Sequence, residues 1–362
     1  MKTKTDEFLI DGHKLYWHLD RVLDWQEKKI ISPLYLEVSP VAYCNHQCIF
    51  CAYDFARQNS LKLKSGIFYK RLKEMAKLGV RSMLYSGEGE PLLHPDIAQF
   101  IQISQKSGID VALASNASLG NKQIWQEILP YLTWARFSLD SGSAAVYAKV
   151  HGVGENIFAK TINSIQDAVS VKRAKKLAVT IGVQFLVLEE NLKDLENALK
   201  VLAGSGIDYL SIKPYSRHPL MKRGKDVIYT PETQSYIEGV LKRNKRLSAG
   251  LKVVFRKEAM NKYLIKENKF KRCRALSFWG HISARGDFYT CGVFIGDKRF
   301  KAGNIYQQDM KEILFGSARR KSIQYGGEKL NASWECRLNC RMARINEFLD
   351  YLDQKPAHQN FI

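Results

Sequence analysis

Short apolar runs alternate along this chain with longer segments in which apolar residues recur at helical spacing. The runs predict buried strands, and the longer segments predict amphipathic helices. The predicted strands are 34–38, 80–85, 110–115, 135–139, 177–187 and 207–212, and the predicted helices are 65–78, 95–106, 122–129, 160–175 and 192–203. Strands joined in turn by helices favour parallel pairing through right-handed crossovers. The expected fold class is α/β, with a curved sheet or partial (β/α)6 barrel.

This alternation is confined to the middle of the chain. An amphipathic helix is expected at 16–28, before Pro33 admits the first strand. After a helix at 231–245 and a strand at 251–255, the pattern changes to a β-hairpin at 278–291, whose turn is Arg285-Gly286, and a final helix near Cys336 and Cys340. The expected parts are an N-terminal extension (1–33), a core (34–250), a small α+β domain (251–350) and a tail (351–362).

The composition is that of a globular protein, with 45% hydrophobic and 25% charged residues. The N-terminus has no apolar signal-peptide region, and no apolar run approaches the ~20 residues of a membrane span. The chain has seven Cys, an odd number that is clustered, which favours ligation in a reducing compartment over disulfides. We therefore expect a cytoplasmic protein with no membrane partner.

The net charge is +20, from 56 Lys and Arg against 36 Asp and Glu. Basic residues gather at 217–225, 242–246, 266–274, 298–301 and 319–321. This pattern predicts an anionic partner, such as a nucleotide-linked sugar, an acidic peptide or RNA. A lysine-rich solvated surface explains the same charge equally well, and no RNA-binding motif accompanies it, so nucleic acid is the least favoured partner.

The strongest chemical signal is the Cys-x3-Cys-x2-Cys loop formed by Cys44, Cys48 and Cys51, directly after the first strand. Three thiolates at this spacing suit an iron–sulfur cubane that keeps one iron open for an outside ligand. Zinc is the alternative, with His46 inside the loop as a possible fourth ligand. Of the two, the spacing favours iron and sulfur.

This loop resembles the signature of the radical SAM superfamily, CxxxCxΦC, with Phe50 as the aromatic residue before the last Cys. The resemblance implies a partial (β/α)6 barrel and a 4Fe-4S cluster whose open iron binds S-adenosylmethionine (SAM). It also implies reductive cleavage of SAM to a 5'-deoxyadenosyl radical that abstracts hydrogen from the substrate. With SAM on the open iron, His46 is expected to support the loop rather than to bind metal.

The second predicted strand ends in a loop that contains Gly87, Glu88, Gly89, Glu90 and Pro91. Glycines at a strand end let the backbone approach a ligand closely. The loop resembles the GGEP motif of the family, which binds the methionyl amino group of SAM. Glu88 replaces one glycine of that motif, so it either faces the substrate or is accommodated within the loop.

Later strand ends offer polar groups at the same rim. The resemblance implies that Ser138 contacts the SAM ribose and that Lys149 or His151 reaches the SAM carboxylate, while Asn116 and Gln184 are further candidates from their strand positions. As sequence features alone these are ordinary strand-end residues. The expected cofactor-binding residues are Phe50, Gly87, Gly89, Glu90, Asn116, Ser138, Lys149 and Gln184.

The remaining thiols are Cys273, Cys291, Cys336 and Cys340. The hairpin brings Cys291 toward Cys273, and the late pair is able to complete a four-thiolate site, for which spacing fits zinc as well as a cluster. The arrangement resembles the SPASM/twitch extension of radical SAM enzymes. The full SPASM pattern needs more Cys, so the shorter twitch form, with one auxiliary 4Fe-4S cluster, is the better match.

Three thiols at the first site and four at the second use all seven, which leaves none to donate hydrogen as in radical epimerases. An oxidation, with the auxiliary cluster accepting an electron, follows most naturally. The expected substrate is a phosphorylated or nucleotide-linked sugar or an aminocyclitol, and the candidate catalytic residues are Glu88, Lys213, Tyr215 and His218. A flavodoxin or ferredoxin is the expected electron donor.

Two other functions compete with this one. Radical SAM enzymes with such extensions also crosslink or epimerise ribosomal peptides, so a peptide substrate is the second hypothesis. The third is a zinc-bearing nucleic-acid-binding protein, which would be colourless and would bind RNA in a salt-sensitive way.

Overall fold

The computed structural model describes residues 13–247, 250–265, 268–354, 357–358 and 360. Its strands form one ten-stranded sheet in the order β10-β9-β8-β1-β2-β3-β4-β5-β6-β7. They are β1 (Tyr35–Val38), β2 (Ser82–Tyr85), β3 (Asp110–Ser115), β4 (Trp134–Ser138), β5 (Thr180–Val187), β6 (Tyr209–Pro214), β7 (Lys252–Phe255), β8 (Trp279–Ile282), β9 (Asp287–Tyr289) and β10 (Lys301–Asn304). Strands β1 to β7 pair in parallel, which confirms the predicted α/β fold.

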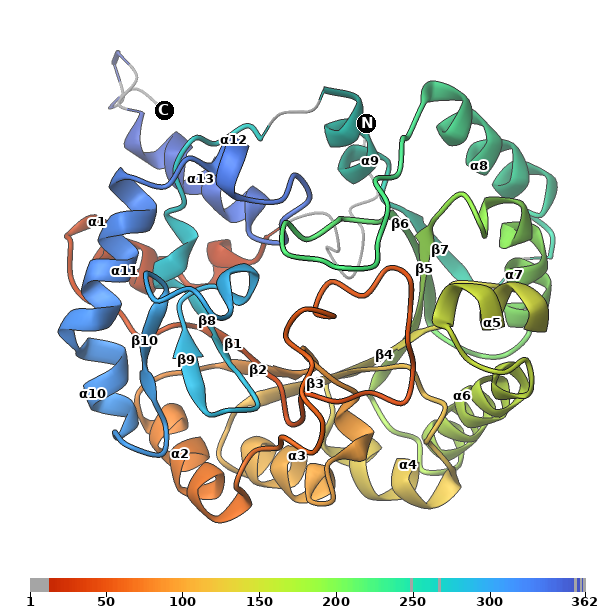
Figure 1. Cartoon of the computed structure of the whole chain (residues 1–362), viewed down its shortest axis with the longest axis horizontal. Coiled ribbons are helices and arrows are strands. Elements are labelled where there is room, and N and C mark those ends of the chain that lie inside the picture. The colour runs from red at the N-terminus through yellow and green to blue at the C-terminus, as the bar shows by residue number, and fades with distance from the viewer. Residues whose placement is uncertain (1–12, 248–249, 266–267, 355–356, 359, 361–362) are drawn as a thin grey trace.

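Helices on the convex side of the sheet cover the strands (Figure 1). These are α2 (Ser65–Lys77), α3 (Ile97–Lys106), α4 (Lys122–Ile128), α6 (Asn156–Ala174) and α7 (Leu195–Leu202). Further helices are α1 (Leu19–Gln26), α5 (Ala144–His151), α8 (Pro231–Arg243), α9 (Lys257–Ile265), α10 (Met310–Phe315), α11 (Ser317–Glu328), α12 (Ala332–Glu335) and α13 (Ala343–Asp353). Figure 1 shows α9, α12 and α13 on the side where the curved sheet stays open.

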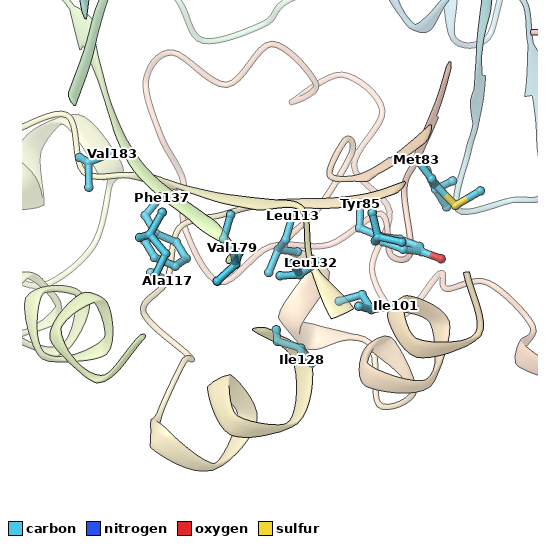
Figure 2. Close-up of a cluster of buried hydrophobic side chains, with 14 of the residues drawn as sticks. Met83, Tyr85, Ile101, Leu113, Ala117, Ile128, Leu132, Phe137, Val179 and Val183 are labelled. Carbon is cyan, nitrogen blue, oxygen red and sulfur yellow. The ribbon is translucent and has the colours of Figure 1, made fainter. Parts of the chain in front are cut away.

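The main core lies between the sheet and this helical layer. Figure 2 shows side chains such as Leu113 and Phe137 pointing from the strands toward Ile101 and Ile128 on the helices. All four are fully buried. At about 25 cal/mol per Å² of buried apolar surface, a layer of this kind is the largest stabilising contribution in the molecule. The sheet is therefore held in place from its outer face.

The sheet extends beyond the six predicted strands on both sides. β7, expected in the small C-terminal domain, pairs in parallel with β6. The predicted hairpin forms as β8 and β9, and β8 pairs in parallel with β1. The pairing of β8 with β1 joins segments more than two hundred residues apart, which local sequence patterns do not encode. Helices α5, α9, α10 and α11 were also not predicted.

The N-terminal segment is tied to the C-terminal part through a buried arginine. Arg319 donates hydrogen bonds to the carbonyl oxygens of Ile31, Leu314 and Ser277, each at 2.8 Å. One residue of the basic run at 319–321 thus serves the interior rather than the surface. The first twelve residues of the predicted extension, and much of the predicted tail, lie outside the described residues.

No helix in the described part of the chain combines the length and the apolar character that crossing a membrane requires.

Candidate active site

The concave face of the sheet carries polar and charged side chains, in contrast to the apolar outer face. In β4, Ala135 and Phe137 belong to the core, whereas Trp134, Arg136 and Ser138 line a cavity. This is the two-residue period of a strand, with alternate side chains on opposite faces. The same strand therefore contributes to stability with one face and to ligand binding with the other.

The cavity has a volume of about 680 Å³, which is within the usual range of small-molecule sites. Its walls come from the inner faces of β1, β2, β4, β5 and β6, from residues 50–53 and from residues 337–344. Cys51 and Cys340 both line it, one from each predicted thiol group. A molecule bound in this space therefore lies between the two groups.

The thiols of the first group lie close enough to one another to interact electrostatically. Burial raises the pKa of Cys44 to about 11, and the negative charges of Glu90 and Cys51 add to this effect. The pKa of Cys48 is also raised well above its ordinary value, first by burial and then by the charges of Cys51 and Cys44. Free thiolates are therefore disfavoured here, and the positive charge of bound iron is what would stabilise them.

Nearby N–H groups already point at these sulfur atoms. Arg57 Nη2 donates to Cys51 Sγ at 3.3 Å, and its Nη1 donates to the carbonyl oxygen of His46 at 2.7 Å. The backbone N–H of His46 donates to Cys44 Sγ at 3.4 Å. Hydrogen bonds of this kind stabilise thiolates that bind iron–sulfur clusters. The three thiols and their donors thus fit a 4Fe-4S cluster.

Two buried histidines accompany the middle thiol. The Nδ1 atom of His151 is 3.3 Å from Cys48 Sγ, and its Nε2 donates to the carbonyl oxygen of Leu139 at 2.9 Å. His46 Nε2 is 3.2 Å from Ser118 Oγ. Burial lowers the pKa of His46 to about 4 and of His151 to about 3, so both are neutral at pH 7. His46 therefore fits the expected supporting role, and His151 packs against the thiol loop rather than lining the cavity.

The predicted SAM-binding residues divide into two sets. Phe50, Gly87, Ser138 and Gln184 line the cavity. Ser138 and Gln184 are paired in register on β4 and β5, which places them on the same rung of the sheet. Lys149 is exposed on α5 and is outside the cavity lining. Its predicted contact with the SAM carboxylate therefore stays a prediction.

Glu90 and Asn116 lie next to Cys44 of the first thiol group. The Glu90 carboxylate accepts hydrogen bonds from Ser115 Oγ at 2.7 Å, from the Asn116 backbone N–H at 2.8 Å and from the Leu92 backbone N–H at 3.1 Å. Asn116 Nδ2 is 3.9 Å from Cys44 Sγ. Both residues lie beside Cys44, outside the cavity lining, and the Glu90 oxygens accept hydrogen bonds from the protein itself. Their predicted contacts with SAM stay predictions.

The glycines of the second-strand loop are required by close packing. Gly87 has a φ of 102°, and a Cβ atom there would lie 2.0 Å from Ser39 Oγ. A Cβ atom on Gly89 would lie 2.1 Å from the carbonyl oxygen of Tyr43, next to the thiol loop. Both positions exclude any side chain. Gly87 borders the cavity itself, whereas Gly89 allows the two loops to touch.

Two candidate catalytic residues line the cavity and two do not. Lys213 and Tyr215, at the end of β6, are part of the lining. Glu88 is buried elsewhere and accepts a hydrogen bond from the Ala284 backbone N–H at 2.7 Å, so it fixes the β8–β9 turn to the β2 loop. His218 is also buried, and its Nε2 donates to the carbonyl oxygen of Val293 at 2.6 Å. The interpretation of Glu88 and His218 as substrate-facing is corrected accordingly.

Several charged residues of the cavity were not predicted from the sequence. They are Lys14, Glu37, Arg136, Arg256, Glu258, Lys262, Arg337, Arg341 and Arg344. Glu37 forms an ion pair with Arg341 and accepts a hydrogen bond from Tyr35 Oη at 2.9 Å. The sequence pointed to three of these residues. Arg136 is a charged residue within a predicted strand, and Arg337 and Arg341 directly follow Cys336 and Cys340.

The four late thiols also interact with one another. The charge of Cys340 acts on Cys273, Cys291 and Cys336, and burial raises the pKa of Cys273 to about 12. A hydrogen bond from Cys336 lowers the pKa of Cys340, with the positive charge of Arg337 acting in the same direction. Asn346 Nδ2 donates to Cys273 Sγ at 3.6 Å. The set fits an iron–sulfur cluster bound by four thiolates.

Two family models match the chain. Residues 38–223, just over half of the chain, match the Radical SAM superfamily, and residues 273–341 match the SPASM iron-sulfur cluster-binding domain. These domains bind, respectively, a 4Fe-4S cluster with SAM and auxiliary iron–sulfur clusters. Iron and sulfur therefore replace the zinc alternative at both thiol groups.

Two curated relatives are 25% identical to this chain over the aligned residues. A tungsten-containing aldehyde ferredoxin oxidoreductase cofactor-modifying protein of Pyrococcus furiosus is 25% identical over 191 residues, which cover 49% of this chain and 50% of that protein. The chain thus spans about half the length of this relative. GTP 3',8-cyclase of Vibrio atlanticus is 25% identical over 301 residues, which cover 77% of this chain and 84% of the cyclase.

A solved structure with the same fold is SuiB of Streptococcus suis. Its complexes with S-adenosylmethionine and with the precursor peptide SuiA give TM-scores of 0.66 and 0.65 at 18% identity. The alignments cover 94% of this chain and 79% and 78% of the respective SuiB chains. At this identity the likeness concerns the fold.

Proposed function

Because the chain belongs to the radical SAM superfamily, we propose that it oxidises a small anionic substrate, such as a phosphorylated or nucleotide-linked sugar or an aminocyclitol. When bound, the first cluster and SAM supply a 5'-deoxyadenosyl radical, which takes a hydrogen atom from a substrate carbon. Loss of a proton and of one electron from the substrate radical would complete the oxidation of an alcohol to a ketone, and the auxiliary cluster that Cys273, Cys291, Cys336 and Cys340 would hold would accept that electron. A flavodoxin or ferredoxin provides the electron that starts each turnover.

The observation that carries this proposal is the cavity that reaches both thiol groups. Cys51 and Cys340 line the same space, so a bound substrate has the SAM-binding site on one side and the auxiliary cluster on the other. Cations greatly outnumber the two carboxylates of the lining, Glu37 and Glu258. Such a space favours a substrate that carries negative charge.

Under this proposal, different residues of the chain bind the clusters, SAM and the substrate. Cys44, Cys48 and Cys51 hold the first cluster, and Cys273, Cys291, Cys336 and Cys340 hold the second. Phe50, Gly87, Ser138 and Gln184 position SAM at the rim of the barrel. Lys213 and Tyr215 lie on the part of the lining that is left for the substrate.

The number of thiols favours oxidation over epimerisation. With seven Cys in two ligand sets, no thiol remains to return a hydrogen atom to the substrate radical. Removal of an electron is then the step that completes the reaction. A crosslink in a peptide would satisfy the same electron count, and SuiB, solved with a precursor peptide, shares the fold. Peptide modification is therefore the competing proposal.

The test is anaerobic reconstitution followed by turnover with labelled compounds. We expect about eight iron atoms per chain, as two cubanes require. With dithionite and SAM, candidate sugar phosphates deuterated at each carbon are offered, and deuterium should appear in 5'-deoxyadenosine together with a ketone product. If a modified product formed only with a ribosomal peptide and with no sugar phosphate, the proposal of a small-molecule substrate would be overturned. Iron content without any cleavage of SAM would overturn the whole proposal.

A further inference from the structure

Four cations from distant parts of the chain converge on one wall of the cavity. Arg136 comes from β4, Lys213 from β6, Arg256 from the residue after β7, and Arg341 from the segment after Cys340. The convergence is close enough that the charges of Arg341 and Arg256 act on both Arg136 and Lys213. Like charges brought together in this way repel each other unless an anion lies between them.

Arg136 is presented to the cavity by its position on the strand. It lies one inward-facing position before Ser138, which places it deeper in the barrel than the rim where Ser138 and Gln184 lie. Its register partner on β3 is Ala114, a small residue that also lines the cavity. Its guanidinium lies 5.4 Å from the centre of the Trp134 ring. The small neighbour leaves space before the guanidinium, and the ring steadies it.

The described residues supply no carboxylate within ion-pair distance of Arg136 or Lys213. Arg341 differs, because Glu37 already balances its charge. Among the described residues, Asp140 is the carboxylate that acts on Lys213, and its effect is smaller than those of Arg136, Arg256 and Arg341. Burial, followed by the charges of Arg136, Arg256 and Arg341, lowers the pKa of Lys213 well below its ordinary value. Two basic side chains with no carboxylate partner among the described residues thus face a cavity that is large enough for a ligand, and an anion bound there would favour the charged form of both.

We infer that Arg136 and Lys213 form a binding subsite for a phosphoryl group of the substrate. This inference rests on the proposed function and narrows its substrate class from any anion to a phosphate ester. A phosphate ester carries nearly two negative charges at pH 7 and three acceptor oxygens, which matches two converging cations. A guanidinium binds two such oxygens side by side, and an ammonium adds a point charge. A carboxylate offers one charge and two oxygens.

The subsite also orients the substrate. Because the phosphoryl group is bound deeper in the barrel than Ser138 and Gln184, the remainder of the molecule extends through the cavity toward Cys51 and Cys340. The reacting carbon is then separated from the phosphate, beside the thiol groups. SAM, at the rim, does not compete for the same cations.

The experiment measures binding of inorganic phosphate to the reconstituted holoenzyme with SAM present, by isothermal titration calorimetry. We expect Arg136→Gln and Lys213→Gln each to weaken phosphate binding about tenfold, since each removes a charge-assisted hydrogen bond. Arg136→Lys should recover part of the affinity. Arg320→Gln, which removes the same charge from an exposed position on α11, should stay within about twofold of the unmodified chain.

Iron content and 5'-deoxyadenosine formed without substrate show that each variant is folded and binds SAM. Unchanged phosphate affinity in Arg136→Gln would overturn the subsite, as would a tenfold rise in the KM for SAM without loss of phosphate binding. Stronger binding of acetate than of phosphate would assign the cations to a carboxylate and also overturn it. If phosphate binds through Arg136 but SAM is never cleaved, the subsite stands and the proposed function fails.

Discussion

The two thiol groups differ in what surrounds their sulfur atoms. Cys44, Cys48 and Cys51 receive hydrogen bonds from outside the set, among them one from the Arg57 guanidinium. The late thiols also receive hydrogen bonds from outside the set, but from the Asn346 amide and the Met342 backbone N–H rather than from an arginine. One set has three thiols, and the other has four. The first is therefore suited to accept an outside ligand, and the second to hold a cluster with no open position.

The groups differ equally in how they are built. The first lies on one loop between β1 and α2, so local sequence assembles it. The second is collected from Cys273, from the segment after β9 and from the segment between α12 and α13. The pairing of β8 with β1 and with β9 brings Cys291 into this part of the fold. A reactive site formed locally and an auxiliary site formed by tertiary packing share one cavity. Variants that affect one group and not the other test this contrast.

The largest expected effect separates the chemistry of the two groups. Cys51→Ala should abolish cleavage of SAM, a fall of at least about a thousandfold, because the cluster that delivers the electron loses a ligand. Cys340→Ala should retain 5'-deoxyadenosine formation and lose the oxidised product. Chromatography of 5'-deoxyadenosine and iron counting distinguish the two. Equal loss of SAM cleavage in both variants would contradict the division of roles.

The second prediction concerns Glu37, which links β1 to the segment beside Cys340. Burial opposes its ionisation, but the charge of Arg341 and the nearby His281, whose Nδ1 lies 3.7 Å from a Glu37 carboxylate oxygen, lower its pKa to about 2, against an ordinary value of 4.5. Since the folded-state pKa is the lower one, ionised Glu37 stabilises the fold above pH 4.5, and this stability is lost as the pH falls toward 2. Glu37→Gln should cost about 3 kcal/mol at pH 6 and much less at pH 3.

Urea unfolding at pH 6, 4 and 3 measures this difference. Glu328→Gln, an exposed position on α11, is the charge-matched control and should change stability by at most about 0.5 kcal/mol at each pH. A deficit in Glu37→Gln that is the same at every pH would mean that packing, rather than charge, joins the two regions.

The third prediction concerns Arg57, the arginine that donates a hydrogen bond to a thiol of the first group. Arg57→Gln removes a positive charge and the N–H that donates to Cys51 Sγ. The first cluster should become harder to reduce, and SAM cleavage should fall about tenfold, the usual lower bound for loss of such a partner. The auxiliary cluster should keep its potential. Redox titration followed by electron paramagnetic resonance measures both, and an equal shift in the two clusters would refute the local role of Arg57.

The smallest effect is expected at Lys149. Because this side chain is exposed on α5, Lys149→Ala should leave the KM for SAM within about twofold of the unmodified value. Ser138→Ala and Gln184→Ala, at the cavity rim, should each raise that KM about tenfold through loss of a hydrogen bond. Steady-state assays of 5'-deoxyadenosine formation measure all three. A larger effect at Lys149 than at Ser138 would restore its predicted role in SAM binding.

Much of the architecture was predictable because it depends on local patterns of apolar and polar residues. The period of two in β4 and β5 and the helical spacing between strands predict the parallel core. The spacing of Cys44, Cys48 and Cys51 predicts the first metal site, since all three ligands belong to one loop. Roles that depend on orientation were harder. Glu88 and His218 are polar residues at strand ends, but each turns into a buried hydrogen bond away from the cavity.

By itself, the sequence determined the fold class, the SAM-binding loop and the number of thiols available to two clusters. Each of these depends on spacing along the chain. Only the tertiary structure decided that Arg136, Lys213 and Arg341 face one space, because their meeting depends on strand register and on the packing of the C-terminal segment over the open side of the sheet. Charges that come together from positions two hundred residues apart leave no periodic pattern in the sequence, and under the proposed function it is these charges that would select the substrate.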